Sequence, residues 1–452
     1  MLDNCSRLVK KAIEMGADDA EAFVLRRSGM EHTIEKNEFK LVASYDSVGR
    51  ALRVVKDNRL GFSYSTDLDN DEPTIEKALA ISKFGKELKD FSFPGPGKAP
   101  DVEKVFDPNL AELPSDYGVE GCEEIIRGAK DVNRDVNVTK GWVKYGLEEH
   151  YVVNSNGLES KDKITYLYSE IDTVLKDKGV STGTEAYWSK LMDADFNAIG
   201  RESAKWAVMT QDPKDIEGGK MTVLFHPMAI REMLEFILAP ALYANRARKG
   251  ESAYSDKVGE MVAQEDISIY DDPTLPNGPN SGSIDDEGIP SSRTDIISKG
   301  QLQNFLYDSL TGSEFSERST GNALRVSRLG QDRQFKEPPV ISARNFILEG
   351  TEKRLDDLIG EVDDGVLVNA VLGAHTSNPA SGDFSVSCPR IVRIERGELT
   401  HSVAAVMLGG NLPSLFGRVS GLGDDRKTMK GAIGALGIIA PTVRFEGIQV
   451  TS

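Results

Sequence analysis

The chain has 452 residues, with 54 Lys and Arg against 72 Asp and Glu, so its formal charge is −18. A surface of this charge repels phosphate backbones, which excludes nucleic acid as an expected partner. The sequence contains no run of about 18 apolar residues, so no membrane-spanning helix is expected either.

The first half of the chain is predicted to mix helices and strands. Apolar residues at helical spacing predict a helix from Leu2 to Met15, which Gly16 ends. Further helices are predicted over 72–84, 117–129 and 199–209. Runs rich in β-prone residues predict strands at 20–25, 33–35, 40–43, 49–55, 60–64, 142–145, 150–153 and 164–167. This pattern favours an α+β domain in which helices cover one face of an antiparallel sheet.

A boundary between two domains is expected near Pro213 and the pair Gly218 and Gly219. The predicted domains are therefore an N-terminal α+β domain, 1–215, and a C-terminal β-rich domain, 216–452.

The second domain begins with a buried-strand run over 221–225 and continues into a long helix whose apolar stripe covers 233–242. Pro240 predicts a kink in that helix. After Gly259 the chain consists of short strands and glycine-rich loops, which favours a sandwich or a barrel-like domain. The long polar stretch 271–288 is predicted to be a structured functional loop.

Cysteine usage favours a reducing compartment. Cys5, Cys122 and Cys388 are odd in number and far apart, which fits no disulfide framework. The first residues lack the basic-then-apolar pattern of a signal peptide. We therefore expect a cytoplasmic protein.

Most catalytic signatures are absent. The sequence contains neither a phosphate-binding G-x-x-x-x-G-K-[ST] loop nor a G-x-G-x-x-G after a strand. The run 179–183 matches G-x-S-x-G in its letters, but a strand-like segment follows it where a nucleophile elbow needs a helix. The histidines are too widely spaced for a compact zinc site, although His375, Cys388 and His401 could still converge in the fold.

Five sequence strings in the second half are unusual. The turn-forming residues Asp, Asn, Pro and Gly would explain each string by itself, but not the presence of all five in this order. They read DDPTLPNG, IDDEGIPSSRT, FLYDS, STGNALR and SNPASGDFS. Together with VGRALRVVKDNRLGFSYSTDLD near the start and PTVRFEGIQV near the end, they resemble the TldD/PmbA family, also called the modulator-of-DNA-gyrase family. The resemblance covers nearly the whole chain. It implies an α+β N-terminal domain, a β-rich C-terminal domain, and a cleft enclosed in a dimer.

The family resemblance also implies which type of subunit this is. TldD-type chains carry the zinc motif H-E-x-x-x-H and a later Cys ligand and cleave peptides, whereas TldE (PmbA)-type chains lack the motif and pair with a TldD-type partner. Here His226 is kept, but Pro227 stands at the position of the general-base Glu and Arg231 at that of the second His. Arginine cannot ligate zinc and proline has no carboxylate. The loop 430–437, which matches the region of the Cys ligand, has no Cys.

We therefore assign no catalytic residue, metal ligand or cofactor to this chain and expect zinc in a TldD-type partner. The implied role is a non-catalytic subunit that helps to enclose the cleft and to hold an unfolded peptide by strand pairing. The candidate substrate-binding residues are Asp285, Asp286, Glu287, Arg293 and Asn322. The alternative is that these acidic residues cap turns.

Two other functions stay open at this point. One is a stand-alone metallohydrolase with an unfamiliar site. The other is a homodimeric module that binds peptides in a cavity between its two copies.

Overall fold

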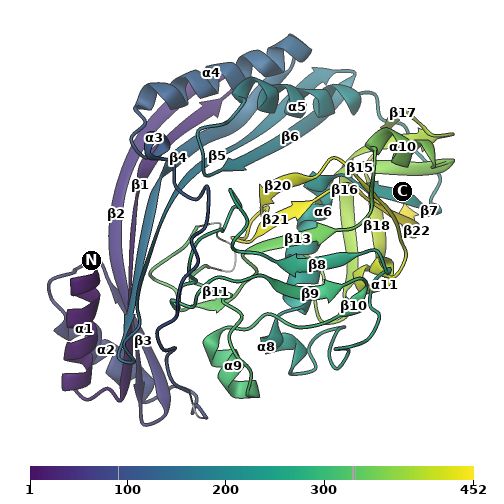
Figure 1. Ribbon diagram of the computed structural model, residues 1–452. Helices are drawn as coiled ribbons and strands as arrows, with labels where there is room; N and C mark the ends of the chain where they lie inside the picture. Colours follow the sequence, from purple (N-terminus) through teal and green to yellow (C-terminus); the bar gives the residue numbers. More distant parts are fainter. Residues whose placement is uncertain (90, 328–329, 331) are drawn as a thin grey trace.

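The computed structural model describes residues 1–89, 91–327, 330 and 332–452 (Figure 1). A strongly curved sheet forms the N-terminal part, and helices line its outer side. The C-terminal part, which is rich in short strands, lies on the inner side of the curve (Figure 1). This arrangement confirms the predicted α+β class.

The N-terminal sheet is antiparallel throughout and has the strand order β3-β2-β1-β4-β5-β6. Its strands are β1 (Asp19–Glu35), β2 (Glu38–Lys56), β3 (Arg59–Ser65), β4 (Asn137–Asn154), β5 (Glu159–Asp177) and β6 (Gly179–Ser189). Short strands predicted separately from the sequence join in pairs: 20–25 and 33–35 lie in β1, 40–43 and 49–55 in β2, and 142–145 and 150–153 in β4. The polar segments between them also pair through the backbone, which needs no apolar side chains.

The helices pack on one face of this sheet, as predicted. They are α1 (Leu2–Glu14), α2 (Glu72–Ser82), α3 (Pro108–Ala111), α4 (Ser115–Val132) and α5 (Phe196–Met209). On β1, Ala22 and Val24 belong to the core beneath α1 and α2, whereas Phe23 packs against Ile284 and Phe335 of the C-terminal part. Because successive side chains of a strand point to opposite faces, the C-terminal part covers the face that the helices leave open.

Strands of the C-terminal part close into a barrel. The pairing runs β7–β15–β16–β18–β22 and returns to β7. These strands are β7 (Gly219–Phe225), β15 (Asp364–Leu372), β16 (Asp383–Glu395), β18 (Val406–Asn411) and β22 (Val443–Thr451). The strands β14 (Glu352–Lys353), β17 (Glu398–Val403) and β19 (Val419–Gly423) extend it. The closed ring confirms the barrel-like architecture predicted for this domain and leaves its central strands no open edge.

A second sheet of the C-terminal part has the order β10-β9-β8-β13-β21-β20, and β11 pairs with β12 beside it. The strands are β8 (Ser268–Asp271), β9 (Thr294–Ser298), β10 (Gln301–Leu302), β11 (Ala323–Leu324), β12 (Val340–Ile341), β13 (Asn345–Glu349), β20 (Lys427–Lys430) and β21 (Gly437–Ala440). Peripheral helices are α8 (Ala244–Ala247), α9 (Ser309–Phe315), α10 (Leu355–Gly360), η2 (Ala374–Thr376) and α11 (Leu412–Phe416). Among the described residues, no helix is both long and apolar enough to span a bilayer.

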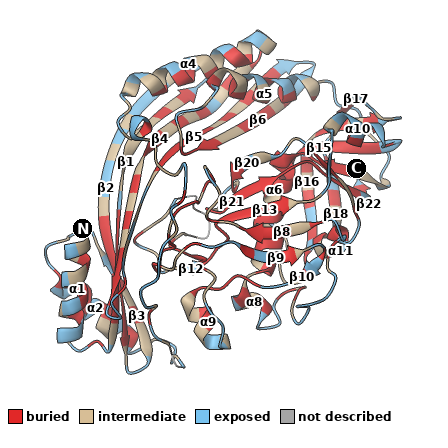
Figure 2. Ribbon diagram, viewed as in Figure 1, coloured by how far each residue is buried: buried red, intermediate tan, exposed pale blue. Residues whose placement is uncertain are grey.

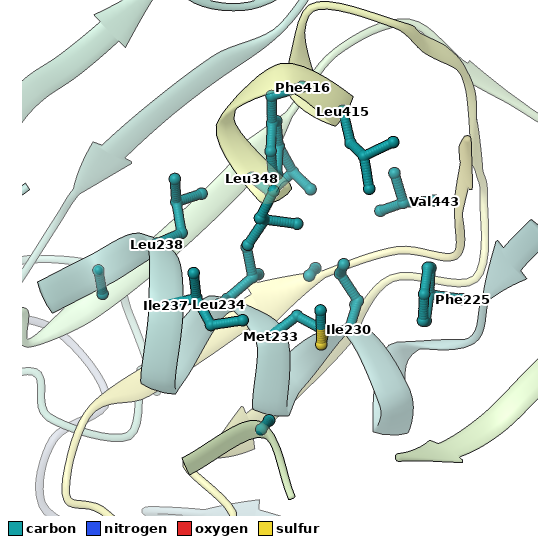
Figure 3. Close-up of a cluster of buried hydrophobic side chains, with 14 of the residues drawn as sticks. Phe225, Ile230, Met233, Leu234, Ile237, Leu238, Leu348, Leu415, Phe416 and Val443 are labelled. Carbon is teal, nitrogen blue, oxygen red and sulfur yellow. The ribbon is translucent and has the colours of Figure 1, made fainter. Parts of the chain in front are cut away.

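The predicted long helix runs through the core of the C-terminal part, where most residues are buried (Figure 2). It consists of α6 (Pro227–Met233), the π-helical turn η1 (Leu234–Leu238) and α7 (Ala239–Ala241). Ile230, Met233 and Leu234 face the same apolar cluster as Leu348 and Phe416 (Figure 3). The predicted kink at Pro240 takes the form of this wider turn, because a proline ring clashes with the carbonyl of an ordinary preceding α-turn.

Candidate functional site

His226 lies where β7 passes into α6, and its side chain caps the helix. Its Nδ1 atom accepts hydrogen bonds from the Met228 backbone N–H (3.2 Å) and from Asn369 Nδ2 (3.1 Å). The imidazole is 9% exposed and packs edge-on against Trp206, with ring centroids 5.2 Å apart. With Pro227 at the first helical position, this is the capping role expected at a strand-to-helix junction.

Burial, with the positive charges of Lys427 and Arg390, lowers the pKa of His226 well below its usual 6.5. The folded imidazole therefore stays neutral at a pH where the unfolded one takes up a proton. The unfolded state binds more protons below pH 6.5, so acidification through this range reduces the contribution of His226 to stability.

We expect the variant His226→Asn to gain stability relative to the wild type as the pH falls. Asparagine is also a good capping residue but does not titrate. Between pH 6.5 and pH 5.5 the gain should be about 1 kcal/mol, measured by urea unfolding of both proteins at each pH. The half-buried His401 is the control position, and an equal gain in His401→Asn would contradict the argument.

A cavity of about 470 Å³ lies beside α6, between the edge of the N-terminal sheet and the barrel. Strands β5 and β6 of the sheet, β15 and β16 of the barrel, α6, and the loop before β21 all contribute to its wall. The lining residues are Glu170, Thr182, Thr184, Met228, Arg231, Glu232, Ala370, Val371, Leu372, Gly373, His375, Pro389, Arg390, Ala432 and Ile433. The cavity therefore lies beside the helix that follows His226, and both the N-terminal sheet and the C-terminal barrel contribute to it.

Two arginines line the cavity. Arg231 is 5% exposed, its Nε has no hydrogen-bond partner, and no ion pair to it is found within the described ranges of the chain. Arg390 donates from its Nη1 to Thr184 Oγ1 (2.7 Å), but its buried Nε is also unpartnered. Burial and the positive charge of Arg231 lower the pKa of Arg390, although Asp172 and Glu232 act in the opposite direction.

Two glutamates follow Arg231 in the sequence, Glu232 on α6 and Glu235 on η1, and they have different roles. Burial raises the pKa of Glu232, at the cavity wall, to about 7. Glu235 is 4% exposed and accepts backbone N–H groups of the loop before β21, from Ala432 (2.6 Å), Ile433 (3.4 Å) and Gly434. Glu235 therefore holds that loop against the helix, whereas Glu232 faces the cavity.

The residues at this position do not suit zinc. Arg231 is a cation without a free electron pair, and the Nδ1 of His226 is already an acceptor for two N–H donors. Cys388 is fully buried, and burial raises the pKa of its thiol, which disfavours the thiolate that binds metal. In the described part of the chain, no group of three or more His, Cys, Asp or Glu side chains is placed to hold a metal ion.

The acidic residues predicted to contact substrate lie away from this cavity. Asp285, Asp286 and Glu287 are fully buried. Asp285 accepts the backbone N–H groups of Glu287 (3.0 Å) and Ile289 (2.9 Å) in a turn, and Asp286 binds Arg333 Nε (2.7 Å). Burial and the charge of Glu287 raise the pKa of Asp285 well above its usual value. These carboxylates serve the fold, and a peptide could reach them only if this packing opened.

The other two predicted substrate contacts are also separate from the cavity. Asn322 is fully buried and donates to Asp271 (2.7 Å), which ties the residue before β11 to the end of β8. Arg293 is about half exposed, pairs with Asp295, and stacks over the ring of Tyr270 at 3.5 Å. The structure therefore brings Asp285, Asp286 and Glu287 together in one loop but places Arg293 elsewhere.

The sequence singles out Arg231 only as the residue at the position of the second motif His, and it gives no prediction for Arg390. Arg390 follows Cys388 and Pro389 and precedes the apolar run 391–392. A charged residue within a strand pattern that is otherwise buried is a signal of an internal partner or ligand, and this signal could have singled it out.

The chain is similar to known proteins over most of its length. Three domains described for PmbA/TldA metallopeptidases match the chain: domain 1 over residues 20–82, the central domain over 105–210 and the C-terminal domain over 218–452. An uncharacterized protein of Methanocaldococcus jannaschii is 28% identical, over 89% of each chain. A metalloprotease of Methanothermobacter thermautotrophicus is 25% identical, over 95% of this chain and 94% of the relative.

The fold is also similar to a solved structure. The crystal structure of TldE from Thermococcus kodakarensis superposes with a TM-score of 0.91 at 26% identity and covers 99% of this chain and 100% of the other. Since the C-terminal family domain alone spans residues 218–452, more than half of the chain, the chain belongs to the PmbA/TldD metallopeptidase family.

Proposed function

We propose that this chain is a non-catalytic, TldE-type subunit of a two-chain zinc metallopeptidase. It helps to enclose the cleft and holds an unfolded peptide, while a TldD-type partner supplies the metal and cleaves the bond. The likeness to TldE of Thermococcus kodakarensis supports the assignment of subunit type.

One observation carries the proposal. The cavity at the motif position is lined by Arg231 and Arg390, where a metal-binding chain needs neutral or anionic donors. Glu170 and Glu232 also line this wall, but no group of three or more His, Cys, Asp or Glu side chains among the described residues is placed to hold a metal ion, and the two guanidiniums repel a divalent cation. Hydrolysis by a metal-activated water therefore requires ligands from another chain.

The edge of the N-terminal sheet offers a place for the peptide. Strand β6 stands at the end of the strand order, and its Thr182 and Thr184 line the cavity. An extended peptide can add to such an edge through main-chain hydrogen bonds, which read little of the peptide's sequence. This property suits a subunit that accepts unfolded peptides of many sequences.

We also propose that the chain is cytoplasmic. The structure gives all three cysteines as free and buried, which agrees with a reducing compartment.

The test is reconstitution with a TldD-type chain from the same organism. We expect the two chains to co-purify and their mixture to cleave an unfolded, fluorescently labelled casein faster than the TldD-type chain alone, while this chain alone is inactive. Replacing the motif glutamate of the TldD-type chain with glutamine should abolish the activity of the mixture. A mixture no more active than the TldD-type chain alone would show that the proposed role is wrong.

Measurements on the isolated chain separate the two alternatives. Near-stoichiometric zinc together with peptide turnover would identify a stand-alone metallohydrolase. A homodimer that captures peptides but does not bind a TldD-type chain would identify a peptide-binding module. Metal analysis, light scattering and peptide pull-down distinguish these outcomes from the expected one.

A further inference from the structure

The cavity beside α6 contains two guanidiniums whose Nε atoms have no hydrogen-bond partner among the described residues. Arg231 is almost completely buried, and a buried guanidinium without a directly paired carboxylate is costly. Within the described ranges no carboxylate lies close enough to Arg231 to form an ion pair, although the cavity holds Glu170 and Glu232. The unpartnered Nε of Arg390 belongs to the same wall.

A bound anion would accept hydrogen bonds from Arg231 and Arg390. It would also reduce the electrostatic repulsion between their two guanidiniums. The planar fork of arginine donors matches the two oxygens of a carboxylate or a phosphate, and such charge-assisted bonds are strong in a partly dry site.

The remaining lining favours a carboxylate over a phosphate. The charged groups that face the cavity are two arginines and two glutamates, so a ligand with a single negative charge is repelled less than a phosphate dianion. The rest of the wall is largely apolar and includes Met228, Leu372 and Ile433. The site therefore suits one carboxylate attached to an apolar group.

We infer that this cavity binds the C-terminal carboxylate of a peptide whose last side chain is apolar, with Arg231 and Arg390 as the carboxylate-binding residues. The apolar wall receives the last side chain, and the adjacent edge of β6 can pair with the preceding backbone. This inference concerns the isolated chain and holds whether or not the chain pairs with a TldD-type partner.

The experiment is titration calorimetry on the isolated chain with three probes. These are the tripeptide acetyl-Ala-Ala-Leu as the free acid, the same tripeptide as the C-terminal amide, and inorganic phosphate. We expect the acid to bind at least about 10-fold more tightly than the amide or phosphate, because only the acid carries a single-charged carboxylate on an apolar residue. Equal binding of acid and amide, or tighter binding of phosphate, would overturn the assignment.

Variants of the two arginines complete the test. Arg231→Met should bind the acid at least about 10-fold more weakly, yet unfold at a higher temperature without ligand, because it removes a buried charge that forms no ion pair. Arg390→Lys keeps the charge but loses the fork and should also weaken binding. The exposed Arg354 provides the control Arg354→Met, which should bind like the wild type. Unchanged binding in Arg231→Met would refute the inference, and failure of the binding test would leave the reconstitution experiment unaffected.

Discussion

Replacing Arg53 with methionine is expected to lower the free energy of unfolding by about 3–5 kcal/mol. Arg53 is 2% exposed and lies on β2, where its guanidinium binds both carboxylate oxygens of Glu21 (2.9 and 2.7 Å). Its third donor binds Glu287 (2.9 Å), which belongs to the C-terminal part. Methionine fills most of the space but leaves Glu287 with one backbone donor, from Ser309, and Glu21 with Arg325 alone.

Urea unfolding followed by circular dichroism measures this effect. The control is Arg26→Met, on the neighbouring strand β1, because Arg26 and Asp46 form an exposed pair at 3.1 Å whose side chains are 45% and 61% exposed. An exposed pair contributes about 0–1 kcal/mol, so the control should change stability little. An equal loss of stability in the two variants would show that the buried ion pairs of Arg53 do not stabilise the packing of the sheet against the C-terminal part.

This network shows what the sequence could not reveal. The pairs Arg53–Glu287 and Arg325–Glu21 join residues 234 and 304 positions apart, so no local pattern links them. From its local pattern, Glu287 is predicted to contact substrate, whereas in the fold its carboxylate accepts a hydrogen bond from Arg53. One signal was present: Arg50 and Arg53 interrupt an apolar strand run, and such residues are rarely buried unless they are paired.

Local patterns did predict the elements well. The stripe of α1 and the adjacent strands predicted at 49–55 and 60–64, now parts of β2 and β3, each depend on residues close in sequence. The long strands were predicted only in pieces, because their polar stretches pair through backbone groups. The cavity depends on six segments that are separate in the sequence, so only its α6 wall could be expected from the motif.

The second large effect is expected at Glu235. Its buried carboxylate accepts three backbone N–H groups of the loop before β21, a loop in which Ile433 is 38% exposed. Hydrogen bonds to a charged acceptor contribute more than neutral ones, and leucine leaves all three donors without it. Glu235→Leu should therefore lower the free energy of unfolding by about 3 kcal/mol and expose the loop 431–436 to a protease, which limited digestion and mass spectrometry would detect.

The matched control is Glu232→Leu, one turn earlier on the same helical segment. The Glu232 carboxylate accepts no hydrogen bond from the described residues, and burial has raised its pKa to about 7, so its charge is already disfavoured in the fold. This variant should be neutral or slightly stabilising in urea and should not change the digestion pattern. Equal losses in both variants would mean that burial of any leucine here, not loss of the acceptor, disrupts the helix.

The contact between Glu235 and the loop bears on the proposed subunit type. The family resemblance implies that the matching loop of TldD-type chains carries a Cys ligand, through which zinc would connect the loop to the helix that bears the motif. Here Glu235, on η1, makes the connection with hydrogen bonds, which need no metal. A chelator should therefore leave the unfolding midpoint of the wild type unchanged, while Glu235→Leu shifts it. A chelator-induced shift as large as that of the variant would show that a metal, and not this carboxylate, holds the loop.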